Sequence, residues 1–444
     1  MAALMAARVA ARVAPVAPPL VAALVATIML AALVLLAGCG GGGADRTKAH
    51  VRLVNASGGY ARLDVQQGGA VRQSALTYGQ SADYADFDRG RSDVTLRATG
   101  SASALATLQP TLDKDRHYTL LAYGSAGALA QVLLDDNEGA AASGQTLLRV
   151  INGAPDAGTL DVYVTAADDS LAAAVPVASA AAYGALGGYV PIASGNWRLR
   201  VAGAGSRSDL RLDAPDLALG SRQRMTLVVT PGAGGVLVNA LALVQQGGIA
   251  RLDGTQARVR AVAGVAGAAV VSAGLGGVPL LAGIGTPAVG GYQRVGAGAV
   301  SPVVSVAGVA APAPATTLAA GADYTLLVYG DAAAPRIAWI TDDNRLPSVG
   351  GQARIRLVNG LADAGTALAM TVDYLPVAGG VAAGTASDYG LVDADTSAQI
   401  AVNALGAAQP LMSAADQALA AGSVYSVFVV GAAAAPTGIV RRDR

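Results

Sequence analysis

The chain has 444 residues but only one cysteine, two histidines, two tryptophans and two phenylalanines. A single cysteine excludes an internal disulfide, so the folded part must be stabilised by burial alone. Aromatic residues make up 4% of the chain and charged residues 14%, and 30 Lys plus Arg balance 30 Asp plus Glu. A chain without net charge or a basic run has no electrostatic footprint for nucleic acid, so we expect no nucleic-acid partner.

The first segment has the pattern of an export signal. Arg8 and Arg12 precede an apolar run at 20–36, which ends in Leu36-Ala37-Gly38-Cys39. A basic start followed by a short apolar stretch is typical of a secretory signal and does not belong to the fold. The tetrapeptide resembles the lipobox of bacterial lipoproteins.

The lipobox resemblance implies that the Cys39 thiol receives a diacylglycerol, that cleavage occurs before Cys39, and that its new amino group is acylated. Each buried methylene contributes roughly 0.8 kcal/mol to membrane binding, so two or three chains anchor a protein firmly. Gly40 stands where inner-membrane lipoproteins of enteric bacteria have aspartate, which implies the outer membrane. A transmembrane helix or an ordinary signal with a chance cysteine remains the alternative. We therefore expect a signal peptide at 1–38, a glycine-rich tether at 39–49 and a lipid-anchored location in the cell envelope, on the periplasmic or surface face.

A long internal repeat organises the rest of the chain. Residues 118–153, YTLLAYGSAGALAQVLLDDNEGAAASGQTLLRVING, reappear at 324–360 as YTLLVYGDAAAPRIAWITDDNRLPSVGGQARIRLVNG. A short apolar stretch that carries arginine, as at Arg52, Arg149, Arg258 and Arg354, occurs four times. Four such openings predict four units of about 100 residues each. Their expected bounds are 50–145, 146–256, 257–352 and 353–444.

A second marker lies near the end of the units. Leu318 to Tyr324 and Leu419 to Tyr425 follow the pattern L-x-x-G-x-x-Y, and Leu112 to Tyr118 follows it without the glycine. The pattern resembles the tyrosine corner of fibronectin-III-like and immunoglobulin-like sandwiches, in which the phenol bonds to the backbone a few residues upstream. The resemblance implies a structural role for Tyr118, Tyr324 and Tyr425. The second unit has Met225 near this place instead.

Each unit shows short alternating segments separated by Gly, Pro, Asn or Asp. In the second unit we expect strands near 148–152, 159–165, 173–178, 187–192, 196–203, 224–230 and 236–243. Alanine-rich 171–182 is expected to be strand and loop, because Pro176 interrupts a helix there. The predicted fold class is all-β, built of tandem immunoglobulin/fibronectin-III-like antiparallel β-sandwich units.

The loop and strand from Asn152 to Val164 carry a family resemblance. Asn152-Gly-Ala-Pro-Asp-Ala-Gly158 precedes Asp161-Val-Tyr-Val164, and Asn359 to Gly365 is a looser copy. These segments resemble the bacterial domain-of-unknown-function 4397 family, DUF4397. The resemblance implies an exported, usually tandem, sandwich-like domain without an assigned activity or catalytic residues.

Pairs of carboxylates suggest a calcium hypothesis. Asp135-Asp136-Asn137 and Asp342-Asp343-Asn344 occupy similar places in the repeat, and Asp156 or Asp363 would have to supply further ligands, because calcium takes six to eight oxygens. The simpler interpretation is that these residues end a strand and are solvated, so we expect no metal and no cofactor.

Other candidate residues favour structural roles. His50 and His117 are expected to be solvated residues at strand starts, and Trp197 and Trp339 to pack in the core. The sequence contains no G-x-S-x-G, P-loop or H-E-x-x-H motif, so no catalytic residue is predicted. The segment 261–292 carries no charge and is expected to form strands and turns rather than a membrane span. The tail 441–444 is expected to be solvated.

These features predict a non-catalytic envelope protein that works by binding or by presenting a structural array. Its partners would be the membrane, through Cys39, and an unknown envelope or extracellular protein or glycan. A calcium-stiffened adhesin-like stalk is one alternative. An envelope hydrolase with a site at a unit junction is the other.

Overall fold

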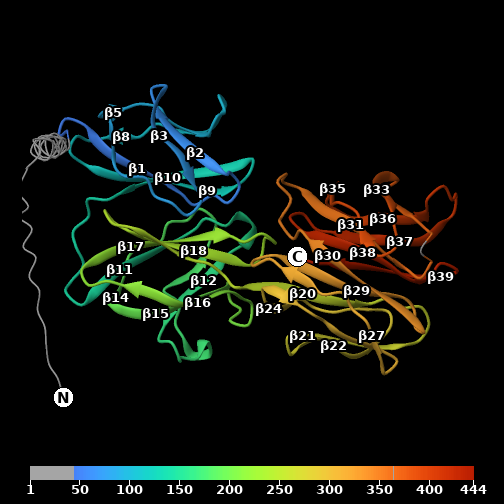
Figure 1. The fold of residues 1–444 in the computed structure, drawn as a ribbon. Coiled ribbons are helices and arrows are strands. Elements are labelled where there is room, and N and C mark those ends of the chain that lie inside the picture. Colours follow the sequence, from blue (N-terminus) through green and yellow to red (C-terminus); the bar gives the residue numbers. More distant parts are fainter. Residues whose placement is uncertain (1–44, 364) are drawn as a thin grey trace, which may run out of the picture. The chain divides into compact units, whose positions relative to one another are not determined.

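The computed structural model describes residues 45–363 and 365–444. The predicted lipidation site Cys39 lies outside these residues. The chain divides into Met1–Thr47 and a compact part, Lys48–Arg444. The described residues of that compact part form β-strands and two single-turn 3₁₀ helices, and they confirm the all-β fold as a series of repeated β units (Figure 1).

Unit 1 contains two main sheets with an apolar interior between them. The first has the strand order β10-β9-β1-β4, the second has the order β3-β2-β6-β7, and β5 pairs with β8. The strands are β1 (Ala49–Asn55), β2 (Arg62–Gln67), β3 (Ala70–Thr77), β4 (Ala85–Phe87), β5 (Gly90–Arg91), β6 (Val94–Ala98), β7 (Ala104–Leu108), β8 (Thr111–Leu112), β9 (His117–Ser125) and β10 (Ala128–Asp135).

The first sheet of this unit is mixed, whereas the sequence suggested wholly antiparallel sheets; the second sheet is antiparallel throughout. Strand β1 is antiparallel to β4 but parallel to β9. A parallel pair needs a long crossover connection, and the second sheet supplies it between β1 and β9. Because side chains alternate along a strand, Val51 and Leu53 of β1 point into unit 1 while Arg52 and Val54 face the other way.

Unit 2 repeats this arrangement with sheets β14-β11-β17-β18-β19 and β13-β12-β15-β16. Its elements are β11 (Gln145–Asn152), η1 (Pro155–Ala157), β12 (Leu160–Thr165), η2 (Leu171–Ala173), β13 (Ala178–Ala181), β14 (Val190–Ala193), β15 (Gly195–Gly203), β16 (Leu210–Leu219), β17 (Gln223–Pro231), β18 (Val238–Val244) and β19 (Ile249–Leu252). The strand expected at 173–178 is wrong, because η2 and a loop occupy most of that range. Strands β16 and β19 were not predicted. Pro215 argued against a strand at its position, because proline has no N–H for the sheet. However, β16 lies at a sheet edge, where a missing N–H is tolerated.

Units 3 and 4 follow the same plan, and in both the opening strand is again parallel to the penultimate one. Unit 3 comprises β20 (Gln256–Ala263), β21 (Val270–Leu275), β22 (Val278–Gly285), β23 (Ala288–Val289), β24 (Gln293–Gly296), β25 (Gly298–Val300), β26 (Val303–Val306), β27 (Val309–Ala311), β28 (Thr316–Leu318), β29 (Asp323–Asp331) and β30 (Ala334–Asp342). Unit 4 comprises β31 (Gln352–Leu361), β32 (Leu368–Val372), β33 (Leu375–Val381), β34 (Thr385–Ala386), β35 (Gly390–Asp393), β36 (Asp395–Ala404), β37 (Pro410–Leu419), β38 (Val424–Ala432) and β39 (Ala435–Arg442). The uncharged segment 261–292 therefore forms strands of unit 3. Among the described residues there is no helix of sufficient length and hydrophobicity to cross a membrane.

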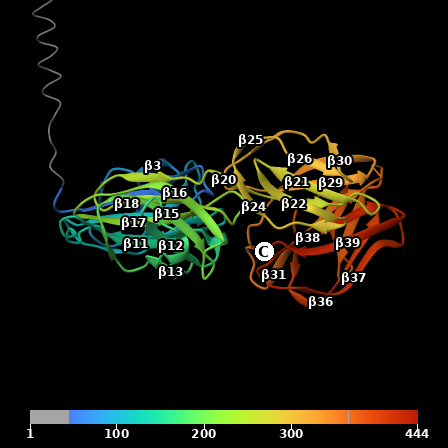
Figure 2. The ribbon, with the colours of Figure 1, turned by 90° about the horizontal axis from the view of Figure 1, so that it is seen from below.

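The units associate in pairs through their first sheets. Besides an interior core in each unit, one apolar cluster joins unit 1 to unit 2 and includes Val54, Leu121 and Val228. A corresponding cluster joins unit 3 to unit 4 and includes Leu327 and Phe428. Figure 2 shows β29 and β30 of unit 3 beside β38 and β39 of unit 4. We call units 1 and 2 the first pair and units 3 and 4 the second pair.

Candidate functional site

The three predicted corner tyrosines bond to the backbone of their own units. The hydroxyl oxygens of Tyr118, Tyr324 and Tyr425 accept the N–H of the residue five positions upstream, at 3.2, 3.0 and 2.9 Å respectively. Each bond fixes the loop that enters the penultimate strand of its unit. In unit 2, Met225 is buried in the core instead.

A polar cluster of an arginine, a hydroxyl-bearing residue and a tyrosine recurs in all four units and faces the partner unit of each pair. An arginine of the opening strand donates from Nε to a hydroxyl on the parallel neighbouring strand, at 2.8–3.0 Å. A tyrosine ring lies against the guanidinium, with its centroid 4.5–5.1 Å from Cζ. The sets are Arg52, Thr119 and Tyr84; Arg149, Thr226 and Tyr189; Arg260, Thr325 and Tyr292; and Arg356, Ser426 and Tyr389.

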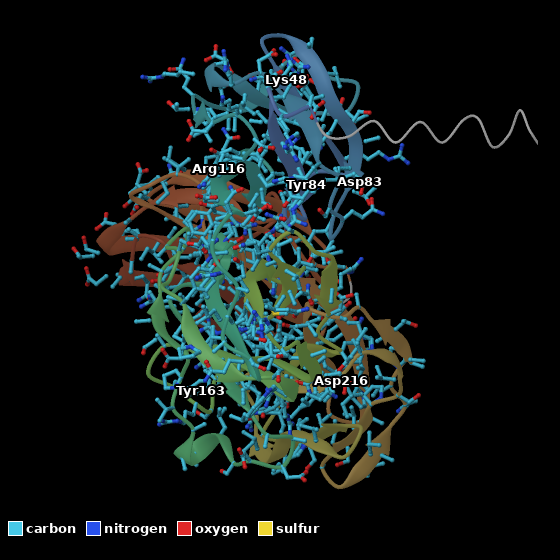
Figure 3. The ribbon with its side chains drawn as sticks, turned by 90° about the vertical axis from the view of Figure 1, so that its left-hand side faces the viewer. Lys48, Asp83, Tyr84, Arg116, Tyr163 and Asp216 are labelled. Carbon is cyan, nitrogen blue, oxygen red and sulfur yellow. The ribbon has the colours of Figure 1, made fainter. Side chains whose placement is uncertain are left out.

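An aspartate at the end of the last hairpin, within its final strand or directly after it, completes this polar cluster in three units. The hydroxyls of Thr119, Thr325 and Ser426 donate to Asp136, Asp342 and Asp443 at 2.5, 2.6 and 2.6 Å. In unit 2 the residue after β18 is Gln245, whose side chain donates to the Glu138 carbonyl oxygen at 2.7 Å. Tyr84, labelled in Figure 3, donates to Asp136 at 2.6 Å, as Tyr292 does to Asp342.

In the second pair the arginines and aspartates cross between the units. Arg260 of unit 3 pairs with Asp443 of unit 4, and Arg356 of unit 4 pairs with Asp342 of unit 3. All four side chains are buried. Burial raises the pKa of Asp342, but Arg356, Arg260 and the neighbouring hydroxyls outweigh it and hold the pKa below its usual value. This reciprocal exchange lets each unit neutralise a buried charge of the other.

The structure changes the alignment behind the calcium hypothesis. Asp136 corresponds to Asp342, because Asp135 is the register partner of Tyr118 as Thr341 is of Tyr324, and both aspartates accept a threonine hydroxyl. The sequence alone matches Asp135 with Asp342 instead. Asp135 pairs with Arg116 at 2.8 Å, and Asp343 pairs with Arg345 and Arg354 at 2.8 and 2.9 Å.

The two further candidate ligands lie elsewhere. Asp156 lies in η1, after β11, and its carboxylate accepts a hydrogen bond from the N–H of Leu346 at 2.8 Å. Asp363 is exposed in the loop after β31. Within residues 45–363 and 365–444, no three His, Cys, Asp or Glu side chains are grouped so that they could hold a metal ion.

The C-terminal tail is solvated as expected only at Arg441 and Arg442, which are exposed, and not at Asp443 and Arg444. The Asp443 side chain is fully buried against Arg260. Arg444 donates to the carbonyl oxygens of Gly235 and Asn344, at 2.9 and 3.2 Å, and so joins unit 2 to unit 3. Burial lowers the pKa of Arg444 to about 10. Asp443 and Arg444 thus have partners far away in the chain.

The two histidines lie together, which the sequence did not predict. His50 and His117 are register partners on parallel strands, with ring centroids 4.8 Å apart. His50 is 3% exposed and its Nδ1 lies 2.9 Å from Asp86, so the expected solvated position is wrong for His50. In unit 3 the same two positions hold Arg258 and Asp323, which form an ion pair.

Both tryptophans are half-buried at the rims of unit cores. The Nε1 of Trp197 donates to the carbonyl oxygen of Ala193, and that of Trp339 to the carbonyl oxygen of Pro314, each at 2.9 Å. Trp339 also contacts Tyr324 edge-on. Their indoles therefore pack within units 2 and 3, respectively.

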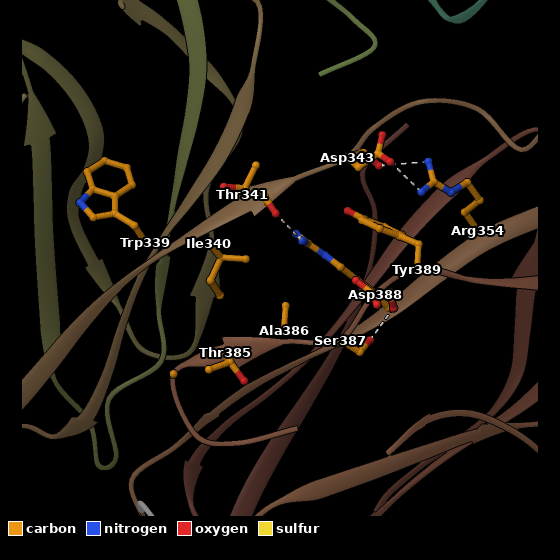
Figure 4. A pocket seen from close by; sticks show the side chains of 12 residues that line it. Trp339, Ile340, Thr341, Asp343, Arg354, Thr385, Ala386, Ser387, Asp388 and Tyr389 are labelled. Carbon is orange, nitrogen blue, oxygen red and sulfur yellow. Dashed lines mark hydrogen bonds and ion pairs between the residues drawn. The ribbon is translucent and has the colours of Figure 1, made fainter. Parts of the chain in front are cut away.

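A polar cavity of about 450 Å³ lies beside the network of the second pair (Figure 4). Its walls come from β30 of unit 3 and from the opening strand and residues 384–389 of unit 4. Arg354 and Asp343 form one side of the cavity, and Thr385 and Ser387 form another. The Tyr389 hydroxyl is buried beside these groups and has no hydrogen-bond partner among the described residues. The arginines of the openings were visible in the sequence, but nothing there linked them to this tyrosine.

The comparisons with known proteins concern two regions. A family model described as "Domain of unknown function (DUF4397)" matches residues 49–163 and 257–368, together about half of the chain. Each match covers the first unit of a pair and runs into the opening strands of the next unit. A search of curated proteins finds no match.

Proposed function

Because the chain belongs to the DUF4397 family, whose description assigns no activity, we propose that it acts as a lipid-anchored cell-envelope protein. Its role is to bind or to present a surface, and it carries out no catalysis. The observation that supports this proposal is the reciprocal exchange of Arg260, Asp342, Arg356 and Asp443.

These ionisable groups are among the most buried charges of the second pair, and they bond to one another across the interface of its units. A general acid, base or nucleophile needs a group that is free to meet a substrate. A buried ion pair whose charges and hydrogen bonds are satisfied instead fixes how two surfaces meet. The buried charges therefore hold two sandwiches in a defined arrangement, while the loops at the sandwich ends remain free to vary.

The anchoring part of the proposal rests on the sequence Leu36-Ala37-Gly38-Cys39 and on the glycines that follow it. Acyl chains on Cys39 would keep the first unit near the membrane, because a ten-residue glycine-rich tether spans only roughly 17 Å. Gly40 favours the outer membrane. The partner would be an envelope or extracellular protein or a glycan that meets the loops or cavities of the units.

Membrane fractionation of Cys39→Ala tests the anchor, with Cys39→Ser as a second variant. The unaltered protein should sediment with membranes and partition into detergent, and both variants should remain in the soluble fraction or retain the uncleaved signal. Sedimentation of processed variants as complete as that of the unaltered protein would contradict lipid anchoring. Protease treatment of intact cells, with a periplasmic protein as integrity control, then identifies the face that carries the units.

A further inference from the structure

The Tyr389 hydroxyl differs from its counterparts in units 1 and 3. Tyr84 donates to Asp136 and Tyr292 donates to Asp342, each at 2.6 Å. The corresponding aspartate of unit 4 is Asp443, which is engaged by Arg260 and Ser426. The Tyr389 hydroxyl is buried and has no hydrogen-bond partner within the described residues. An unsatisfied buried hydroxyl is unfavourable, so a bound group that completed its bond would be favoured.

The first pair shows the same position filled by protein. Tyr189 of unit 2 lies between Arg149 and Arg224, as Tyr389 lies between Arg354 and Arg356. There the Glu138 carboxylate bonds to Arg224 at 3.2 Å, and burial together with this negative charge raises the pKa of Tyr189. In the second pair this place is next to the 450 Å³ cavity. That volume falls within the roughly 300–1,000 Å³ typical of small-molecule sites.

The lining of the cavity limits the chemistry of its ligand. Arg354 is paired with Asp343, so these opposite charges compensate one another. The Tyr389 ring is covered by guanidinium groups, and the Trp339 indole points away from the other lining residues in Figure 4. A flat aromatic ligand would therefore find no ring to stack on, and an anionic ligand would find no uncompensated positive charge among these paired groups. The exposed Asp388 carboxylate is a lining charge with no ion pair among the described residues, and it can accept hydrogen bonds from a ligand.

What the cavity offers is a set of hydroxyls and carboxylates from both units. Thr341 comes from unit 3, and Thr385, Asp388 and Tyr389 come from unit 4. A hydroxyl can donate and accept, while an ionised carboxylate only accepts. The complementary ligand is small and carries several hydroxyl groups that themselves donate and accept.

We propose that the cavity beside Tyr389 binds a neutral sugar, with the Tyr389 hydroxyl bonding to a ring hydroxyl and Thr385 and Asp388 holding its neighbours. Recognition rests on hydrogen bonds without stacking, which predicts millimolar affinity and dependence on individual hydroxyls. This inference extends the proposed binding role and does not depend on the lipid anchor.

Ligand-observed NMR saturation transfer on the purified full chain tests the site. The probes are glucose, N-acetylglucosamine, cellobiose and chitobiose, with adenosine as a mismatched aromatic probe. We expect saturation transfer to at least one sugar and none to adenosine. Binding of adenosine in preference to the sugars, or binding of no probe at 10 mM, would overturn the inference.

Two variants tie binding to the cavity. Tyr389→Phe removes only the hydroxyl and should weaken sugar binding at least fivefold, and Thr385→Val should act in the same direction. Tyr189→Phe, the equivalent change in unit 2, should leave binding unchanged. Unchanged melting temperatures confirm that each variant is folded, and equal sugar binding in all three would place the sugar elsewhere. Membrane fractionation of Cys39→Ala is unaffected by any of these outcomes, so failure here and failure of the proposed anchoring are distinguishable.

Discussion

Arg260 and Asp443 lie 183 positions apart and form an ion pair in which their side chains are 1% and 0% exposed. The pair joins the first strand of unit 3 to the residue that follows the last strand of the chain. Arg356 of unit 4 and Asp342 of unit 3 form a second such pair. Each unit therefore contributes one arginine and one aspartate to the ion pairs across the interface. The end of the chain is therefore part of the core of the second pair.

Replacing Asp443 by Asn should strongly destabilise the second pair. The change leaves the Arg260 charge buried without its main counterion, a loss that typically costs about 3–5 kcal/mol. Chemical denaturation followed by circular dichroism measures the change in the free energy of unfolding. Asp416→Asn, at an exposed position of the same unit, should be close to neutral. Equal stability of the two variants would show that the buried pair contributes nothing.

The pair, rather than the single unit, should be the cooperative folding unit. A fragment of residues 257–444 keeps the apolar cluster that contains Leu327 and Phe428, whereas residues 257–352 leave Leu327 exposed. We expect the longer fragment to unfold in one sharp transition and the shorter one to aggregate or to melt at a lower temperature. A single unit 3 that melts at the temperature of the pair would contradict this expectation.

The corner bonds should contribute modestly to stability. Tyr324→Phe removes the acceptor of the Ala319 N–H and should cost about 1 kcal/mol of unfolding free energy. Tyr425→Phe should behave alike, because its hydroxyl also bonds to the backbone. Tyr374→Phe is the matched control, since this side chain is 87% exposed. If Tyr374→Phe lowered the unfolding free energy as much as Tyr324→Phe, the loss could not be attributed to the corner hydrogen bond.

Unit 1 should lose stability as the solution becomes mildly acidic. Burial, followed by the neighbouring His50, lowers the pKa of His117 in the folded state, while Asp136 and Asp115 oppose the shift. The unfolded chain therefore takes up a proton first, near pH 6.5, and stability falls as the pH decreases from there toward the folded pKa. Melting curves between pH 7.5 and 5.5 measure this loss, which His117→Gln should reduce. Identical pH profiles of the two proteins would contradict it.

The general plan of the fold was accessible from sequence because the interior positions alternate with polar ones. Val51 and Leu53 mark an inward face on each side of Arg52, and the same pattern opens every unit. The polar network was harder to predict. Arg52 and Thr119 bond because β1 and β9 are parallel neighbours, but the strands of the second sheet lie between β1 and β9 in the sequence. No local pattern reports such a partner.

The cavity and the chain end illustrate the same limit. The Tyr389 hydroxyl has no hydrogen-bond partner in the part of the chain that the structure describes, and Asp443 is bound by Arg260 of another unit; neither fact follows from a local sequence pattern. The composition of the tail suggested solvation, but Asp443 is buried against Arg260 of unit 3, and Arg444 donates to the Gly235 carbonyl oxygen of unit 2. A charged segment of the sequence predicts solvent exposure only where no residue distant in the chain pairs with its charges.

The most direct test of the account is mass spectrometry of the N-terminal peptide from the protein extracted from native membranes. If the protein is a lipid-anchored envelope array, the tryptic peptide from Cys39 to Arg46 should carry a diacylglyceryl thioether and an acylated amino group. Cleavage at another position, or an unmodified Cys39 within an intact N-terminal segment, would contradict the anchoring on which the proposed function depends.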